Sequence, residues 1–141
     1  MATQAKLNLS GLEEYMEALI AAGDDVDAAA QEAIVKGALV IQKEMLDLVP
    51  VGKSPKDPHP GNLKRHIQID GPYIDGNFSW VDVGVIHKKG FTDKETAIYG
   101  NVQEYGSASN QPQPYIRPGI DHGTPKARKK IIQVLKARGK L

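Results

Sequence analysis

Cysteine is absent from this chain of 141 residues. Its absence excludes disulfides, thiolate zinc sites, iron–sulfur clusters and a cysteine nucleophile. Long apolar runs are absent too: the longest, residues 33–41, is interrupted by Lys36 and is far shorter than the roughly 20 residues of a membrane span. The first residues lack the apolar stretch of a signal peptide, so we expect a protein that stays in the cytoplasm and has no membrane partner.

Net charge is also nearly absent, at +1, which excludes a globally basic nucleic-acid binder and an acidic tail protein. The average hides an asymmetry. Residues 1–49 carry nine acidic and three basic side chains, a net −6, and residues 50–121 carry eight of each. Residues 122–141 carry seven basic side chains and no acidic one, a net +7. The chain is therefore a charge dipole along its length.

A short helix is predicted near the N-terminus. Residues 10–13, Ser-Gly-Leu-Glu, have the form of a capping box, and Gly23 is suited to end the helix in the left-handed conformation. Its expected apolar face consists of Leu12, Met16, Leu19 and Ile20.

A long second helix is the strongest pattern in the chain. Asp24 or Asp25 caps it, and Asp27 in its first turn suits the helix dipole. Apolar residues recur every three or four positions over about 22–24 residues, until Val49-Pro50 stops the helix. These residues are Ala30, Ile34, Ala38, Ile41, Met45 and Leu48.

The middle of the chain predicts three strands, at residues 63–70, 78–86 and 98–105. Gly71-Pro72 is expected to end the first strand, and residues 75–77 supply turn chemistry before the second. In the second strand, every other residue is a valine that shares one face. These valines are Val81, Val83 and Val85.

A loop at 106–113, an extended segment at 114–118 and a last helix complete the predicted order. This helix begins at Thr124-Pro125, or earlier near Pro118, and runs to about Ala137. We therefore predict one α+β domain over residues 1–141, with two N-terminal helices (one long), a small, mainly antiparallel sheet and a C-terminal helix packed on the sheet. Residues 1–8, the proline-rich loop 50–62 and residues 139–141 are expected to be flexible.

Catalytic motifs are not found in the sequence. It has no phosphate-binding glycine loop, no paired-histidine helix motif and no glycine-flanked serine. The four histidines are scattered, and no ligand spacing supports a metal site built on Asp121 and His122. We therefore expect no enzyme, no cofactor, no metal and no small-molecule substrate.

The basic C-terminal segment admits three interpretations. It is a helix with a solvated cationic face, a contact for nucleic-acid phosphates, or a partner for an acidic surface. That surface could belong to a different protein or to residues 1–49 of a neighbouring copy, which we call the acidic front; residues 122–141 are the basic tail. The candidate interface residues are Lys126, Arg128, Lys129, Lys130, Lys136 and Arg138 in the tail, with Asp24, Asp25 and Asp27 in the front.

Residues 99–119 carry a more specific pattern, Tyr-Gly-Asn-Val-Gln-Glu-Tyr-Gly-Ser followed by Gln-Pro-Tyr-Ile-Arg-Pro-Gly. It resembles the "Tyr-Ala … Val-Glu-Tyr/Phe-Gly … Pro-Phe-Leu-Arg-Pro-Ala" signature of a tail-component family of long-tailed phages, also described as minor tail, tail-completion or head–tail joining proteins. Gly100 and Gly119 stand where the family has alanine, and the likeness extends over about residues 9–137. The signature residues are Tyr99, Val102, Glu104, Tyr105, Gly106, Pro114, Tyr115, Arg117 and Pro118.

The resemblance implies a structural protein of the phage neck, in the virion of a phage or prophage and in the host cytoplasm during assembly. It implies a homo-oligomeric ring, of six subunits in the virion, built from a protein that is a monomer in isolation. Tail terminator and tail tube would lie on one side, and head-completion or connector proteins on the other. DNA would pass through the lumen without sequence recognition. The competing hypothesis is a small nucleic-acid-binding protein that uses the basic C-terminal helix.

Two features of the signature have a physical interpretation. Gly106 suits a turn with positive φ. Glu104 and Arg117 either form a charged hydrogen-bonded pair across the loop or are two independent surface charges.

Overall fold

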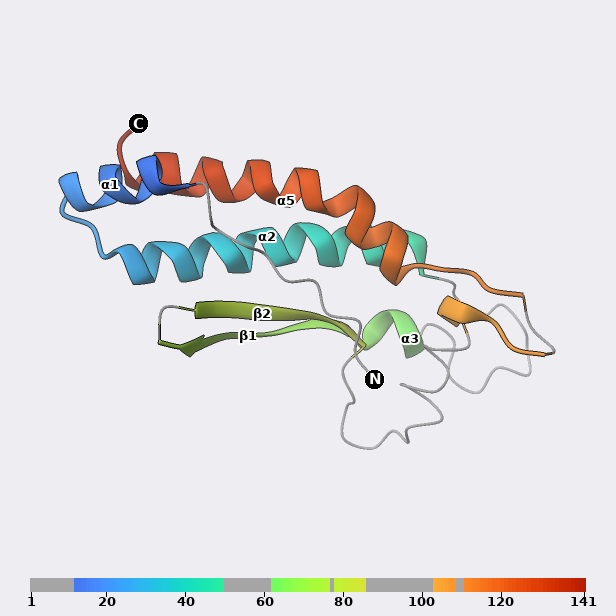
Figure 1. Ribbon diagram of the computed structural model, residues 1–141. Coiled ribbons are helices and arrows are strands. Elements are labelled where there is room, and N and C mark those ends of the chain that lie inside the picture. Colours follow the sequence, from blue (N-terminus) through green and yellow to red (C-terminus); the bar gives the residue numbers. More distant parts are fainter. Residues whose placement is uncertain (1–11, 50–61, 77, 86–102, 109–110) are drawn as a thin grey trace.

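The computed structural model describes residues 12–49, 62–76, 78–85, 103–108 and 111–141. Along the chain lie α1 (Glu13–Ala21), α2 (Val26–Leu48), α3 (Asn62–Arg65), β1 (Ile67–Asp75), β2 (Phe78–Val85) and α5 (Ile116–Arg138). This is the predicted α+β architecture: two N-terminal helices, a small antiparallel sheet and a C-terminal helix that packs on the sheet where its N-terminal part joins the hairpin's core. Figure 1 shows α2 between the β1–β2 hairpin and most of α5, with α1 beside the C-terminal end of α5.

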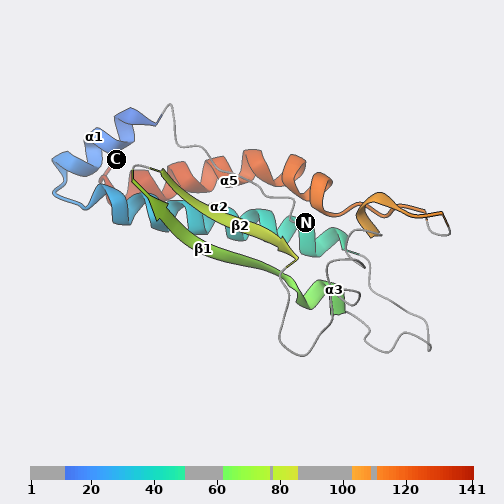
Figure 2. The ribbon, with the colours of Figure 1, turned by 60° about the horizontal axis from the view of Figure 1, so that its bottom comes forward.

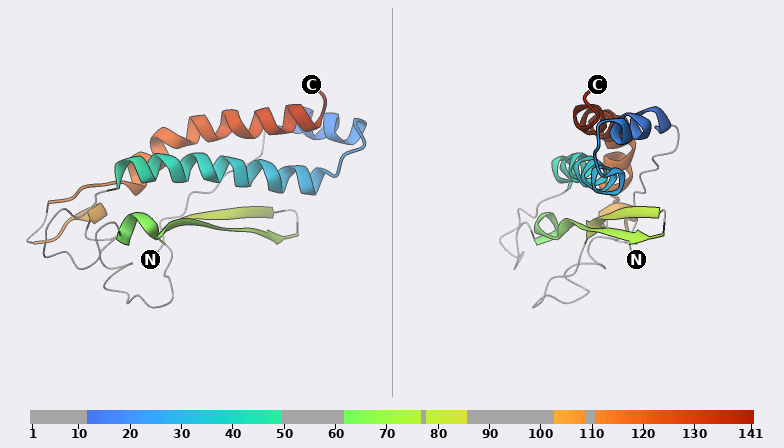
Figure 3. Two further views of the ribbon diagram at one scale, coloured as in Figure 1. Left: turned by 180° about the vertical axis from the view of Figure 1, so that it is seen from behind. Right: turned by 90° about the vertical axis from the view of Figure 1, so that its left-hand side faces the viewer.

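Helix α2 is confirmed at 23 residues, within the predicted length. Its N-cap is Asp25, whose carboxylate accepts hydrogen bonds from the amides of Asp27 (3.0 Å) and Ala28 (3.2 Å). The buried stripe is wider than the periodicity predicts, because the hairpin and α5 cover different sides of the helix (Figure 3). Leu48, expected in this stripe, is 40% exposed. The buried residues are Ala29, Ala33, Ile34, Gly37, Ala38, Ile41 and Met45.

Helix α1 buries only one edge. Leu12 and Leu19 are buried against α2 and α5, and Gly23 has the expected positive φ of 74°. Ile20 was predicted on the same apolar face, but it is 66% exposed. One residue turns the helix by about 100°, so the side chain after Leu19 points away from a contact this narrow.

The hairpin is antiparallel, with Ile67 opposite Val85 and Tyr73 opposite Trp80. Gly71-Pro72 does not end β1, contrary to the prediction. Between the Asp70–Asp82 and Tyr73–Trp80 pairs, two residues of β1 face one of β2, so the strand continues through a bulge, a place where sheets tolerate proline. The start of β1 also differs, because residues 62–65 form the short helix α3.

The core lies between the hairpin and the two long helices. Val81 and Val83 are buried against α2, as their alternation predicts, and the amide of Gln42 donates to the carbonyl of Ile67 at 3.0 Å. Tyr115 and Ile116 close the same core from the first turn of α5. Figure 2 shows the hairpin lying along α2, with its turn toward the N-terminal end of that helix.

Helix α5 begins close to the earlier of its two predicted starts, near Pro118. It begins at Ile116, so the extended segment expected at 114–118 is wrong from that residue onward, and Thr124 is not an N-cap. The Thr124 hydroxyl donates instead to the carbonyl of Ile120, at 2.6 Å. Pro118 fits in the first turn because the amides there have no intrahelical acceptor to lose.

Close contact with α2 explains the glycines in α5. A Cβ atom on Gly119 would lie 2.6 Å from Met45 Cγ and 3.1 Å from Met45 Cα, and one on Gly123 would lie 3.1 Å from Ile41 Cα. Ala127 continues this row of small, buried residues one turn later. The two glycines therefore let the helix backbones approach closely.

Several expectations fall outside the described residues: the Ser10 capping box, most of the loop 50–62, and the third strand as far as residue 102, with Tyr99 and Val102. The last three residues of that strand, 103–105, form a helical turn instead. Beyond α5, the amides of Gly139 and Leu141 donate back to the carbonyls of Leu135 and Lys136, each at 2.9 Å. No helix among the described residues is both long and apolar enough to cross a membrane.

Candidate functional site

The Glu104 carboxylate caps the N-terminus of α5. Its Oε2 atom accepts hydrogen bonds from the amides of Tyr115 (2.7 Å) and Ile116 (2.8 Å), and its Oε1 atom accepts one from the amide of Arg117 (3.0 Å). Glu104 is only 5% exposed. A negative charge is favoured here, because the first amides of a helix lack intrahelical acceptors and the helix dipole is positive at this end.

Proline completes this arrangement. Residue 118 comes directly after the three amides that Glu104 accepts, and as a proline it has no amide hydrogen that needs a partner. The next amide, of Gly119, donates to the carbonyl of Tyr115 at 3.2 Å. Every backbone donor from residue 115 to 119 is thus accounted for by Glu104, by Pro118 or by the helix.

The proposed pairing of Glu104 with the Arg117 side chain is not formed. Glu104 accepts from the Arg117 backbone, and the Arg117 guanidinium lies 4.0 Å from the Asp121 carboxylate, with its side chain 85% exposed. Sequence reasoning weighed only side-chain partners. The signal for a helix cap is an acidic residue, Glu104, that precedes a segment with a proline suited to a first helical turn, Tyr-Ile-Arg-Pro at 115–118.

The signature loop is tied together around this cap. The amide of Gln113 donates to the carbonyl of Gln103 at 2.7 Å, and Gly106 adopts the expected positive φ, at 79°. Pro114 is exposed, whereas Tyr115 is fully buried. A shallow depression of about 310 Å³ lies beside the cap, lined by Glu104, Tyr105, Arg117, Ile120 and Asp121.

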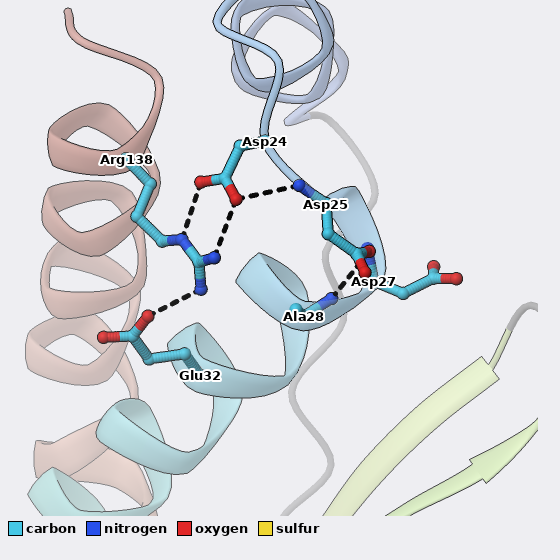
Figure 4. A network of polar contacts seen from close by, with 6 residues as sticks. All are labelled: Asp24, Asp25, Asp27, Ala28, Glu32 and Arg138. Carbon is cyan, nitrogen blue, oxygen red and sulfur yellow. Dashed lines mark hydrogen bonds and ion pairs between the residues drawn. The ribbon is translucent and has the colours of Figure 1, made fainter.

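The acidic front and the basic tail of the chain meet within one copy. Arg138 donates two hydrogen bonds to Asp24, from Nε to Oδ2 and from Nη2 to Oδ1, both at 2.8 Å, and a third to Glu32 at 2.7 Å (Figure 4). These contacts raise the pKa of Arg138, and the Arg138 hydrogen bonds lower the pKa of Asp24 below its ordinary 3.8.

A second ion pair joins α5 to α2. Lys126 Nζ lies 2.5 Å from Glu44 Oε1, and this hydrogen bond lowers the pKa of Glu44 below its ordinary 4.5. Two of the predicted tail cations, Lys126 and Arg138, are therefore engaged inside the molecule. Of the acidic candidates, Asp24 is engaged with Arg138, Asp25 caps α2, and Asp27 is exposed in its first turn.

The other candidate cations lie at different positions around α5. Arg128 and Lys129 are exposed, Lys130 is half-buried, and the Lys136 ammonium lies 5.9 Å from the centre of the Tyr15 ring. A shallow groove of about 460 Å³ lies along the C-terminal part of α5. It is lined by Lys129, Ile132, Gln133, Lys136, Ala137 and Leu141.

Sequence reasoning missed an aromatic cluster on the hairpin. The Trp80 ring lies 5.6 Å from the Tyr73 ring and 5.6 Å from the Phe78 ring, measured between ring centres. The valine alternation held the signal: if Val81 and Val83 point inward, Trp80 and Asp82 must point outward.

The described residues contain no group of three or more histidine, aspartate or glutamate side chains placed to hold a metal ion. No family model, no curated protein and no solved structure matches this chain.

Proposed function

We propose that this protein is a structural component of a phage or prophage neck. It completes the tail or joins it to the head through protein–protein contacts, as a ring of identical subunits. Its neighbours would be the tail terminator and tail tube on one side and head-completion or connector proteins on the other. DNA would pass along the ring axis. The proposal starts from the resemblance of residues 99–119 to the phage signature.

The Glu104 cap is the observation that supports this proposal most directly. In the signature, an acidic residue comes before the arginine and a proline follows the arginine directly. Here those residues hold the start of α5 through backbone hydrogen bonds. The signature residues therefore have a structural role that involves no chemical reaction, as expected of an assembly protein.

Deletion of the gene in the phage or prophage that encodes the chain tests the proposal. We expect lysates in which filled heads and free tails are separate under the electron microscope. Adding the purified wild-type protein should restore joined particles. Joined, infectious particles after a complete deletion would overturn the proposal.

The nucleic-acid hypothesis predicts a different result with the isolated protein. Lys126 and Arg138 already pair with carboxylates, which leaves five of the seven tail cations for phosphates. If the proposed function is right, we expect duplex DNA to bind only weakly at physiological salt. Sub-micromolar binding by the monomer, with a salt dependence of several phosphate contacts, would favour the nucleic-acid hypothesis.

A further inference from the structure

The tip of the hairpin exposes an apolar patch. Phe78 is 52% exposed, Tyr73 is 40% exposed and both pack on the half-buried Trp80. Ile74 is 58% exposed at the same tip, but it pairs with Ser79 and so lies on the other face of the hairpin. Single exposed apolar residues are common on proteins, but several large ones in contact are typical of an interaction surface.

The charged side chains of the hairpin itself are all carboxylates. Residues 67–85 contain three aspartates and no lysine or arginine, a net −3. Asp70 and Asp82 lie directly opposite one another across the strands, an arrangement that like charges make unfavourable. The Tyr73 hydroxyl donates to Asp70 at 2.6 Å, and the two carboxylates raise the pKa of that hydroxyl. A partner with cations and an apolar surface would match this face.

This chain carries such a surface on its opposite side. The groove on α5 combines the ammonium groups of Lys129 and Lys136 with the apolar side chains of Ile132 and Leu141, and Leu141 is 69% exposed. Residues 122–141 contain no acidic side chain. Figure 1 and both views in Figure 3 place α5 and the hairpin, the two elements that carry these surfaces, on opposite sides of α2.

We propose that the hairpin tip of one copy docks in the α5 groove of the next copy. Asp70 and Asp75 approach the lysines that line the groove, and the aromatic cluster covers its apolar part. The contact joins two different faces, so it is heterologous and repeats from subunit to subunit until a ring closes. This inference rests on the proposed ring and assigns its subunit contact.

Disulfide trapping tests the contact. Because the chain contains no cysteine, only the introduced residues can form a disulfide. Asp75→Cys is made in one sample and Lys129→Cys in another. We expect the mixture to form a disulfide-linked dimer under mild oxidation, and the single variants alone to form far less. A chain with both substitutions should give a ladder of covalent oligomers that a reducing agent dissolves.

A charge swap tests the same contact without cross-links. Lys129→Glu alone and Asp75→Lys alone should each weaken self-association about tenfold or more, and together they should restore much of it. Lys36→Glu, an exposed reversal on α2, is the matched control and should leave association unchanged. Sedimentation measures the oligomers, and the emission of the chain's one tryptophan, Trp80, should shift to shorter wavelength as docking excludes water from its ring.

The results separate this inference from the proposed function. If both reversal variants form rings as the wild type does, and no mixed disulfide appears, the hairpin–α5 contact is overturned. The proposed function as a neck protein is then unaffected. Cross-linked dimers of one single-cysteine variant would indicate a symmetric contact and also overturn it. A wild-type chain that stays monomeric at all concentrations, with no mixed disulfide, would overturn the contact. The gene deletion would then decide the proposed function by itself.

Discussion

Arg138 and Asp24, which are 114 residues apart in the chain, are held together by two parallel hydrogen bonds of 2.8 Å. The planar guanidinium matches the two carboxylate oxygens, a geometry that lysine cannot reproduce. Because Asp24 lies between α1 and α2, this pair connects the last turn of α5 to the loop that joins those two helices (Figure 4).

Removing the guanidinium should loosen that connection. We expect Arg138→Gln to lower the midpoint of thermal unfolding more than Lys140→Gln, which removes a nearby exposed cation. The difference should shrink in concentrated salt, because both partners are partly exposed to solvent and their attraction is screened. Equal midpoints for the two variants at low salt would show that the pair adds nothing to stability.

Acid should remove the same contribution. The pKa of Asp24 is lowered by Arg138, so its stabilising effect is complete above its ordinary pKa of 3.8 and is lost as the pH falls through the lowered value. Asp24→Asn should therefore lower the unfolding midpoint at neutral pH, and its difference from wild type should shrink below pH 3.8 and disappear as the pH falls through the lowered pKa. In an Arg138→Gln background, Asp24→Asn should change the midpoint little at either pH. Denaturation curves at a series of pH values measure both.

The helices of the fold could be predicted more fully than the contacts between them. The repeat of apolar residues and the cap at Asp25 are local features, and both were confirmed. The start of α5 is not local, because its first amides depend on a carboxylate more than ten positions earlier in the chain. Pro114 and Pro118 by themselves predict an extended segment. Only the Glu104 carboxylate, which accepts from the first amides of α5, explains why a helix begins there.

The candidate site shows the same limit. Composition located the tail cations, but only the packing of α5 against α2 separates Lys126 and Arg138, which pair inside one copy, from Lys129 and Lys136, which line the outer groove. The exposed cluster around Trp80 depends on which face of the hairpin meets α2, and the valine alternation alone indicates that choice.

Glu104 should be among the most sensitive polar residues of the chain. Glu104→Ala leaves three amides at the start of α5 without their acceptor, and we expect it to lower the free energy of unfolding by about 2–4 kcal/mol. Glu104→Gln keeps an oxygen acceptor and should cost less. Asp121→Asn, an exposed carboxylate on the same helix, should change stability by less than about 0.5 kcal/mol.

Hydrogen exchange provides the local readout for this cap. The amides of Tyr115, Ile116 and Arg117 should exchange faster in Glu104→Ala than in wild type, while those in the middle of α2 change less. Unchanged exchange at these three amides would contradict the cap, whatever the overall stability.

An alanine at residue 119 should fit poorly, although the phage signature has alanine there. Alanine favours a helix over glycine by about 1 kcal/mol. Its Cβ atom would nonetheless lie 2.6 Å from Met45 Cγ and 3.1 Å from the Met45 backbone, so the Met45 side chain must move and the two helices must separate slightly. Since overpacking costs about 1–3 kcal/mol, we expect Gly119→Ala to destabilise the protein in chemical denaturation. Gln133→Ala, on the exposed side of α5, is the control and should not destabilise it.

The loss in the double variant Gly119→Ala/Met45→Ala should be smaller than the sum of the single losses, because the shorter residue 45 frees part of the space. Fully additive losses would mean that residues 119 and 45 do not compete for that space.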